Sequence, residues 1–182
     1  MEPTAILITG ANRGIGEGLL KLYLAKPNHT VIVGNRDPNH PPSQALLSLP
    51  KAEGTTLFLV KIDANVESDP ADAVKQLASQ GIDHLDIVIA NAGIALTWCK
   101  VSEVTAELLQ KHFTINVYGF VWLYQAVLPL LKKSQHPLWV TIGSSAAFLT
   151  VCSTTYEERR LYVLMCGLLE HASHEECRIC AF

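Results

Sequence analysis

Short apolar runs alternate with helix-like segments along most of the chain, and this alternation strongly limits the possible folds. The apolar runs are residues 5–8, 30–33, 55–62, 86–90 and 138–142. Apolar residues recur at helical spacing in the segments between them, residues 15–23, 70–80 and 106–132. Continuous apolar strands are typical of a parallel sheet that is covered by helices on both faces. The sequence therefore predicts an α/β fold, a doubly wound parallel sheet in three α/β/α layers.

Two of the segments between the runs allow more detailed predictions. The first helical segment predicts a buried face made of Ile15, Leu19, Leu20, Leu22 and Tyr23. The segment from Pro70 to Gln80 has its proline near the first turn, where a helix accepts one. The stretch from Asn39 to Pro42 is rich in proline and predicts a loop.

Composition narrows the classes of partner. The chain has 182 residues, with 14 basic and 17 acidic side chains and a formal net charge of −3. This length fits one domain of about 100–200 residues. Nucleic-acid-binding domains normally carry a clustered basic face, and no run of lysines and arginines is present here. With 49% hydrophobic and 17% charged residues, the chain can form a core. We expect a small-molecule partner and no nucleic acid.

The sequence also predicts the compartment. The apolar stretch from Gly119 to Leu131 contains Gln125 and Pro129 and is shorter than the roughly 20 residues that span a bilayer. The first apolar run follows Met1-Glu2-Pro3 without a basic region, so no secretory signal is expected. The five cysteines are odd in number and irregularly spaced, which is typical of reduced thiols. We expect no membrane span and a cytoplasmic location.

A glycine-rich stretch, residues 9–16 (TGANRGIG), lies between the first apolar run and the first helical segment. Glycines at such a position allow a tight turn, and they let a pyrophosphate approach the N–H groups at the start of the helix. Gly16 would also permit close packing of helix on strand. The stretch predicts a dinucleotide-binding turn, and the alternative is an ordinary turn without a ligand.

Charged residues after the second and third apolar runs bear on the choice of cofactor. An arginine near the end of the second strand accommodates the 2′-phosphate of NADP, whereas an acidic residue binds the ribose hydroxyl of NAD. Arg36, supported by Arg13, favours NADP (NADPH), although the adjacent Asp37 would favour NAD if the strand ended one residue later. The alternative for Arg36 is a solvated loop charge. Asp63 is predicted at the same edge of the sheet, with a helix cap as its alternative.

Four motifs in order give the chain a family resemblance over residues 4–147. They are the glycine-rich stretch, Asn91-Ala92-Gly93 after the fourth run, Asn116 in the long helical segment, and Ser144 after the fifth run. The pattern resembles the short-chain dehydrogenase/reductase family, with its Rossmann-type fold. The chain is most similar to the carbonyl-reductase branch that includes fungal ketoreductases acting on polyketides. The resemblance implies hydride transfer between nicotinamide and a carbonyl or alcohol substrate, and a homo-oligomer.

The resemblance assigns roles residue by residue. Asp63 would bind the adenine, Asn91 would contact the adenosine ribose, Asn116 would hold a proton-relay water, and Ser144 would hydrogen-bond the substrate carbonyl. The expected cofactor-binding residues are Gly10, Asn12, Arg13, Gly14, Ile15, Gly16, Arg36, Asp63, Asn91, Ala92 and Gly93. Two alternatives remain open. Asn116 in an apolar helix would also be explained by a bond to nearby backbone, and Ser144 by a small residue in a turn.

The chain departs from the family after Ser144. Family members carry a Tyr-x-x-x-Lys unit in which the lysine lowers the pKa of the tyrosine, but Lys133 is the last lysine of this sequence. Tyrosine alone has a pKa of about 10 and is poorly matched to proton transfer near neutral pH. The nearest equivalent is Tyr156 with Arg160 one helical turn later, so the expected catalytic residues are Ser144, Tyr156, Asn116 and Arg160. Glu157 and Glu158 would oppose this by raising the tyrosine pKa.

The tail differs from the rest of the chain. Residues 1–150 are expected to form the nucleotide-binding domain, and residues 151–182 an atypical tail of that domain, with the later strands of the family missing or altered. The tail contains His171, His174, Cys177 and Cys180 at three-residue spacing, which is too close for a usual zinc site, so no metal is expected. Two functions are therefore considered: an NADP-dependent carbonyl reductase, and a truncated, weak or inactive relative that retains nucleotide binding or an interaction role.

Overall fold

A six-stranded sheet in the order β3-β2-β1-β4-β5-β6 forms the centre of the computed structural model, which describes residues 2–96, 102–143 and 178–181. All pairings of neighbouring strands are parallel. The strands are β1 (Thr4–Thr9), β2 (His29–Asn35), β3 (Thr56–Lys61), β4 (Ile87–Ala90), β5 (Leu138–Thr141) and β6 (Arg178–Ala181). The first five confirm the strands that the apolar runs predict. The strands β2 and β3 lie on one side of β1, and β4, β5 and β6 lie on the other. The order of the strands in the sheet therefore changes direction between β3 and β4.

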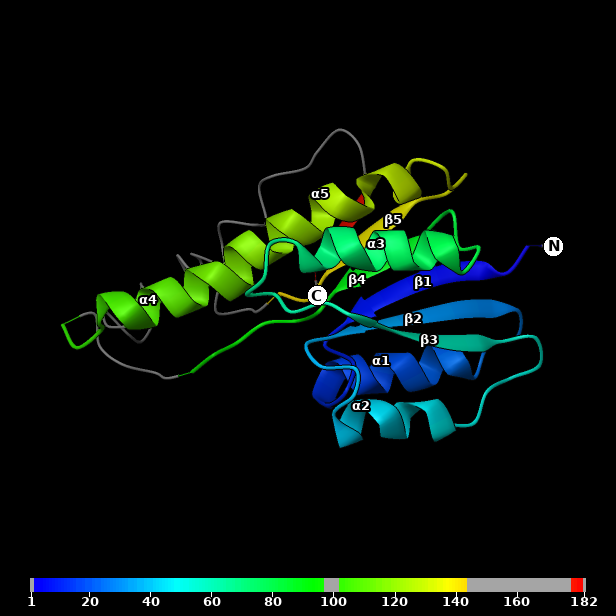
Figure 1. The fold of residues 1–182 in the computed structure, drawn as a ribbon, viewed down its shortest axis with the longest axis horizontal. Coiled ribbons are helices and arrows are strands. Elements are labelled where there is room, and N and C mark those ends of the chain that lie inside the picture. Colours follow the sequence, from blue (N-terminus) through cyan, green and yellow to red (C-terminus); the bar gives the residue numbers. More distant parts are fainter. Residues whose placement is uncertain (1, 97–101, 144–177, 182) are drawn as a thin grey trace.

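Helices cover both faces of this sheet, as the predicted three-layer architecture requires (Figure 1). The helices are α1 (Gly14–Leu24), α2 (Pro41–Ala45), α3 (Asp69–Ser79), α4 (Ala106–Phe113) and α5 (Gly119–Leu131), with a 3-10 turn η1 (Leu46–Ser48) and a π-helical turn η2 (Thr114–Tyr118). In Figure 1, α1 and α2 lie on one side of the sheet and α3 and α5 on the other.

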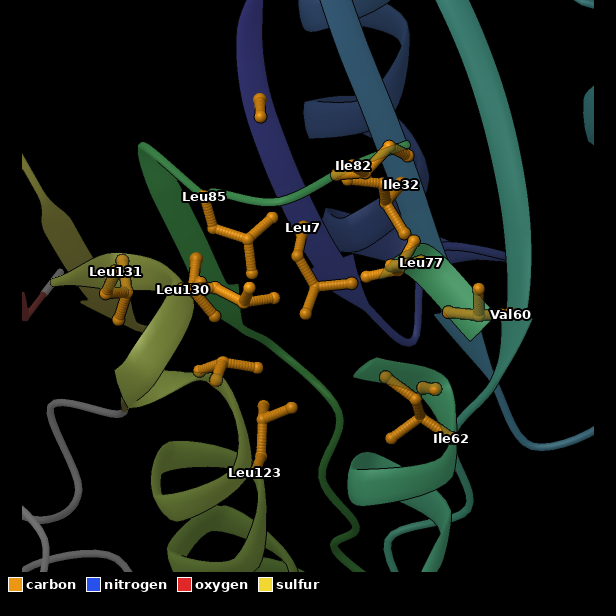
Figure 2. Packing of buried hydrophobic residues seen from close by; sticks show 14 of the residues in the cluster. Leu7, Ile32, Val60, Ile62, Leu77, Ile82, Leu85, Leu123, Leu130 and Leu131 are labelled. Carbon is orange, nitrogen blue, oxygen red and sulfur yellow. The ribbon is translucent and has the colours of Figure 1, made fainter. Parts of the chain in front are cut away.

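The strands bury side chains on both faces because successive residues of a strand point in opposite directions. In β1, Ala5 and Leu7 belong to one apolar cluster, and Ile6 and Ile8 belong to the other. Figure 2 shows the first cluster, where Leu7 lies among side chains from neighbouring strands and from the helices α3 and α5. The labelled members contributed by the two helices are Leu77, Leu123, Leu130 and Leu131.

Trp139 of β5 fixes the position of α5. Its side chain is fully buried, and two aromatic rings of α5 approach it edge-on. The ring centroids of Phe120 and Tyr124 lie 5.2 Å and 5.0 Å from that of Trp139, at interplanar angles of 88° and 89°. Edge-to-face pairs at this spacing add about 0.5–1.5 kcal/mol each beyond the burial of their area.

The buried face of α1 agrees in part with the one that the sequence predicts: Leu20 is buried, and Leu19 and Tyr23 pack against the core. Gly16, Leu20 and Leu24 are buried, whereas Ile15 is 64% and Leu22 is 65% exposed. Residues four apart share a helix face, and positions 15 and 22 are rotated away from the face that carries 16, 20 and 24. Gly16 determines which face of α1 is buried, since the absence of a side chain there lets the helix lie against the preceding turn.

Two further predictions are wrong at the level of elements. The predicted loop from Asn39 to Pro42 instead ends inside α2, which begins at Pro41; proline suits the first helical turn because no N–H is needed there. The sequence of the tail shows no convincing strand, yet residues 178–181 form β6 and pair with β5, with Leu138 opposite Arg178. The strand β6 forms because it pairs with the open edge of β5. The local sequence of the tail does not show that this edge is available.

The elements α4, η2 and α5 form one continuous helix, Ala106–Leu131, through Gln125 and Pro129. By length and composition alone this helix could cross a membrane, a test that core helices of soluble proteins also pass. In the structure, its second half packs Leu123, Val127 and Leu130 into the core against the sheet. Pro129 lies inside α5 and has no N–H to donate to the carbonyl oxygen of Gln125, so one bond of the helix is missing there.

Candidate functional site

The glycine-rich turn leaves β1 at the carboxyl edge of the sheet and enters α1. Gly10 and Gly14 have φ angles of +66° and +58°, a left-handed conformation that glycine adopts without strain. A Cβ atom at Gly16 would lie 2.6 Å from the carbonyl oxygen of Gly10 and 2.5 Å from Nδ2 of Asn91. The helix can therefore approach the turn only with glycine at this position, as the motif predicts.

A polar cluster from β4 holds one side of the turn. Nδ2 of Asn91 donates to the carbonyl oxygens of Thr9 at 2.8 Å and Gly10 at 3.2 Å. In return, the Thr9 hydroxyl accepts from the backbone N–H groups of Asn91 at 3.1 Å and Ala92 at 3.0 Å. Thr9 is only 2% exposed. Its role is not predicted by the sequence, where the only signal is a hydroxyl at the end of an apolar strand.

A second cluster, from β2, holds the other side. Oδ1 of Asn35 accepts from the backbone N–H of Ala11 at 3.1 Å, and Nδ2 of Asn35 donates to the hydroxyl of Ser43 at 3.2 Å. That hydroxyl donates to the carbonyl oxygen of Asp37 at 2.8 Å. Asn35 and Ser43 are both buried, and neither is singled out by the sequence. The turn is thus fastened to both strands that flank β1.

The start of α1 presents backbone donors at this turn. The first helical bond runs from the N–H of Glu17 to the carbonyl of Arg13, at 3.2 Å. The N–H groups of Gly14, Ile15 and Gly16 precede it and find no acceptor among residues 2–96, 102–143 and 178–181. Free N–H groups at a helix start, with the helix dipole behind them, bind phosphate. A Cβ at Gly14 would meet no atom within 4 Å, so this position is open. These residues fit the pyrophosphate of a dinucleotide.

Charged residues lie at the same edge of the sheet. Arg36 is exposed directly after β2, and Arg13 is exposed directly before α1. The carboxylate of Asp37 accepts from the backbone N–H of Asn39 at 2.8 Å, so it is engaged in its own loop. Arg36 follows the last residue of β2, which is the strand end that the NADP interpretation assumes.

Asp63 lies after β3 and shapes a loop. Its Oδ1 accepts from the backbone and side-chain amides of Asn65, at 2.9 and 3.0 Å. Its own N–H donates to the buried carboxylate of Asp69, at 2.9 Å. The alternative role as a helix cap is wrong, because Ser68 occupies the cap position of α3. Asp69 also pairs with Lys61 at 3.2 Å, and nothing in the sequence singled it out.

Asn116 stands in the π-helical turn η2, a type of turn that is frequent at functional sites. Its Oδ1 accepts from the N–H of Ile94 at 2.9 Å, and its Nδ2 donates to the carbonyl of Ile94 at 2.9 Å. The side chain therefore bonds nearby backbone, which is the alternative left open by the sequence. The relay water stays a prediction.

The structure brings together most of the predicted cofactor residues. A Cβ at Gly10 would touch Ala92 at 3.1 Å, and one at Gly93 would lie 3.3 Å from Oδ1 of Asn116. The turn, the Asn91-Ala92-Gly93 stretch and Asn116 thus form one continuous site. The adenosine-ribose contact of Asn91 stays a prediction, since its amide is used on Thr9 and Gly10. Ser144, Tyr156 and Arg160 lie outside the described residues, as do His171, His174 and Cys177 of the tail.

At the opposite edge of the sheet, Glu2, Asp83 and His84 have potential metal-ligand atoms within 4.8 Å of one another. His84 contacts Asp83 at 3.1 Å and Asp86 at 3.5 Å. The hydrogen bond from His84 holds the pKa of Asp83 below its usual value, and the charge of Lys133 lowers it further. His84 thus lies between two aspartates of this surface group.

Known proteins resemble this chain in sequence and in fold. The family model for short chain dehydrogenase matches residues 4–156. A short-chain dehydrogenase of Neurospora crassa is 41% identical over 146 residues, which are 80% of this chain and 58% of that protein. A norsolorinic acid ketoreductase of Emericella nidulans is 40% identical over 148 residues, 81% of this chain and 56% of that protein. The chain therefore spans less than two thirds of the length of these relatives.

Solved structures agree with the sequence comparison. The NADPH-bound carbonyl reductase from chicken fatty liver superimposes with a TM-score of 0.79 at 26% identity, over 93% of this chain and 71% of that one. The match includes the parallel sheet that carries the turn, since it covers nearly the whole chain. With the family model matched over more than half of its residues, this chain belongs to the short-chain dehydrogenase/reductase family of oxidoreductases.

Proposed function

We propose that the protein binds NADP(H) at the turn between β1 and α1 and catalyses hydride transfer between its nicotinamide and a carbonyl or alcohol carbon. The observation that carries the proposal is the turn itself. Its three first helical N–H groups lack acceptors among the described residues, and Asn35 and Asn91 hold it from both sides. We also propose that the protein is located in the cytoplasm.

The preference for NADP over NAD rests on Arg36. Its guanidinium makes no hydrogen bond or ion pair with the residues that the structure describes, and it follows the strand end directly. Asp37, which would favour NAD, has its carboxylate bound to Asn39. A guanidinium recognises phosphate through paired, charge-assisted hydrogen bonds. The carbonyl reductase from chicken fatty liver, which binds NADPH, supports the same choice.

The proposed substrate is a ketone of apolar, aromatic type, as in polyketide metabolism. Two observations support it: one relative is named a norsolorinic acid ketoreductase, and the apolar side chain of Leu96 is exposed in the loop that leaves this site. Bound NADPH would supply the hydride to the carbonyl carbon. By family resemblance, Ser144 would hold the carbonyl oxygen and Tyr156 would give it a proton, with Arg160 supplying positive charge and Asn116 the relay.

A second candidate is nucleotide binding without turnover. Two features of the sequence favour it: no lysine follows Ser144, and Glu157 and Glu158 stand beside Tyr156. Arginine keeps the charge of lysine but presents a planar fork rather than a compact ammonium. The two candidates share the cofactor site and differ only in the proton donor.

Cofactor binding is tested by titrating the protein with NADPH and with NADH, followed by nucleotide fluorescence. We expect NADPH to bind more tightly, and Arg36→Leu to remove most of that preference while leaving NADH affinity within about twofold. Loss of a charge-assisted contact of about 1.5–3 kcal/mol corresponds to about a tenfold to hundredfold weaker NADPH binding. Lys51→Leu, a change far from the turn, is the matched control. Absence of NADPH binding by the unaltered protein would contradict both candidates.

Turnover separates the two candidates. NADPH oxidation is measured with a panel of aryl ketones, for the unaltered protein and for Tyr156→Phe. Oxidation that is lost in Tyr156→Phe while NADPH affinity is retained supports hydride transfer with Tyr156 as proton donor. NADPH binding without oxidation of any ketone supports the second candidate.

A further inference from the structure

Two side chains of one helix attach the loop that leaves β4, and family resemblance assigns a role to only one of them. Asn116 bonds the backbone of Ile94, as described above. His112, four residues earlier and thus on the same helix face, accepts from the backbone N–H of Leu96 at 3.2 Å through Nε2. The loop of residues 94–96 is therefore held at both ends.

The imidazole of His112 is buried, with 4% of the residue exposed, and both of its nitrogens are used. Nδ1 lies 2.8 Å from the carbonyl oxygen of Leu108, which can only accept, so Nδ1 carries the hydrogen. Nε2 then has a free lone pair for the N–H of Leu96. The ring is the neutral tautomer, and it links α4 to a loop sixteen residues earlier in the chain.

The loop carries apolar side chains beside the cofactor site. Leu96 is 54% exposed, and the loop follows Gly93, which lies against Asn116. Ligands of open α/β sheets bind outside the carboxyl ends of the strands, and this loop leaves β4 at that edge. A large exposed apolar residue in this place suits an apolar substrate rather than a charged one.

We propose that His112 is a positioning residue that holds Leu96 as an apolar contact for an aryl ketone next to the nicotinamide. The inference rests on the proposed function, which places the ketone beside the nicotinamide, but it does not require that the ketone is reduced. Without the acceptor at Nε2, the N–H of Leu96 loses its partner and the loop is fixed only at Ile94. Ketone affinity then falls while the dinucleotide turn, fastened by Asn35 and Asn91, is unaffected.

The test uses 2-acetylnaphthalene as the probe ketone and measures two dissociation constants, one for NADPH and one for the ketone in the presence of NADPH. His112→Phe keeps a planar ring and removes the acceptor. We expect ketone affinity to fall about fivefold or more. His112→Gln places an amide oxygen near the position of Nε2 and should stay within about twofold of the unaltered protein. NADPH affinity should stay within about twofold in both variants.

Leu96→Ala gives a second route to the same proposal, because the exposed side chain can be removed without disturbing the fold. It should weaken the ketone about fivefold, and adding His112→Phe should weaken it little more, since both changes remove one contact. Unchanged ketone affinity in Leu96→Ala, or equal losses of NADPH and ketone in His112→Phe, would overturn the proposal. So would a lack of ketone binding by the unaltered protein when NADPH binds. Ketone binding without NADPH oxidation would instead contradict hydride transfer alone.

Discussion

Thr9 couples the turn to β4 through a single hydroxyl that accepts two backbone N–H groups, those of Asn91 and Ala92. Thr9→Val keeps the shape of the side chain and leaves both donors without this acceptor. An unsatisfied buried donor costs about 1–3 kcal/mol. Because both of these bonds are only partly buried, we expect the free energy of unfolding to fall by about 1–3 kcal/mol in total and NADPH affinity to fall with it. Urea unfolding followed by circular dichroism measures the first and nucleotide fluorescence the second.

Thr9→Ser is the control for this prediction, because it restores the hydroxyl and removes only a methyl group. It should recover most of the stability and affinity. Equal behaviour of the valine and serine variants would mean that the hydroxyl contributes nothing to the site.

Gly16 and Gly18 allow a matched comparison within α1. A Cβ at Gly16 would lie at 2.5 and 2.6 Å from atoms of Asn91 and the turn, whereas one at Gly18 meets nothing within 4 Å. We expect Gly16→Ala to destabilise the fold by about 1–3 kcal/mol and to weaken NADPH binding. Gly18→Ala should stabilise it by about 0.5–1 kcal/mol through helix propensity. Urea unfolding of both variants checks this, and a stabilised Gly16→Ala would contradict the packing described.

Single residues of the site differ in how far the sequence predicts them. Gly10, Gly16 and Asn91 follow from a local motif, and the structure places them as that motif implies. Asn35 and His112 do not, because their roles depend on which strand or loop becomes their neighbour. Asn35 reaches the turn only since β2 pairs beside β1 with Thr9 opposite Gly34. Such contacts depend on which strands pair and in which register, and a local motif does not specify either.

At the scale of elements, Trp139 holds β5 and α5 together. Trp139→Ala removes a fully buried side chain and its contacts with Phe120 and Tyr124. Truncation of a buried aromatic residue costs about 3–5 kcal/mol, and we expect a loss of that size in urea unfolding followed by circular dichroism. Val121→Ala in α5, at a position 38% exposed, is the control and should change stability by less than about 0.5 kcal/mol.

Tyr23, near the end of α1, gives the stability a dependence on alkaline pH. Partial burial raises its pKa above the usual 10.0. A raised folded-state pKa stabilises the fold below pH 10 and loses that contribution as pH rises through the folded-state value. Tyr23→Phe keeps the ring that Lys26 overlies at 5.0 Å and removes the phenol. Urea unfolding between pH 8 and 11 should show a shallower alkaline loss in the variant, and parallel curves would contradict the prediction.

Elements were predicted well wherever one local pattern decides them. The first five strands follow from apolar runs, since helices cover both faces of the sheet (Figure 1) and favour apolar residues at successive positions of a strand. The predicted face of α1 is wrong at Ile15 and Leu22, which are apolar yet exposed, because close packing at Gly16 decides the rotation of the helix. The strand β6 is not predicted by its local sequence, because it forms by pairing with β5, a segment about forty residues earlier in the chain.

At the scale of the whole molecule, local stability should vary in a defined way. The strand β1 is paired on both sides and buried, whereas His112 is the only buried residue of α4. Amide exchange of β1 should require global unfolding, and that of α4 only local opening. We expect amides of α4 to exchange at least about a hundredfold faster, as measured by mass spectrometry. Equal protection would contradict this, and protection that rises with protein concentration would indicate that α4 is covered in a homo-oligomer.

Of the two asparagines that bond the turn, Asn35 is the last residue of β2 and Asn91 directly follows β4, and these strands lie on opposite sides of β1. The nucleotide site is thus complete only after both neighbours have joined the central strand. If NADPH binds there as proposed, its fluorescence during refolding would therefore report a late event, the pairing of β1 with both of its neighbours, and not the formation of any one strand pair or helix. Because the ligand binds only that united state, it also shifts the folding equilibrium toward it by mass action.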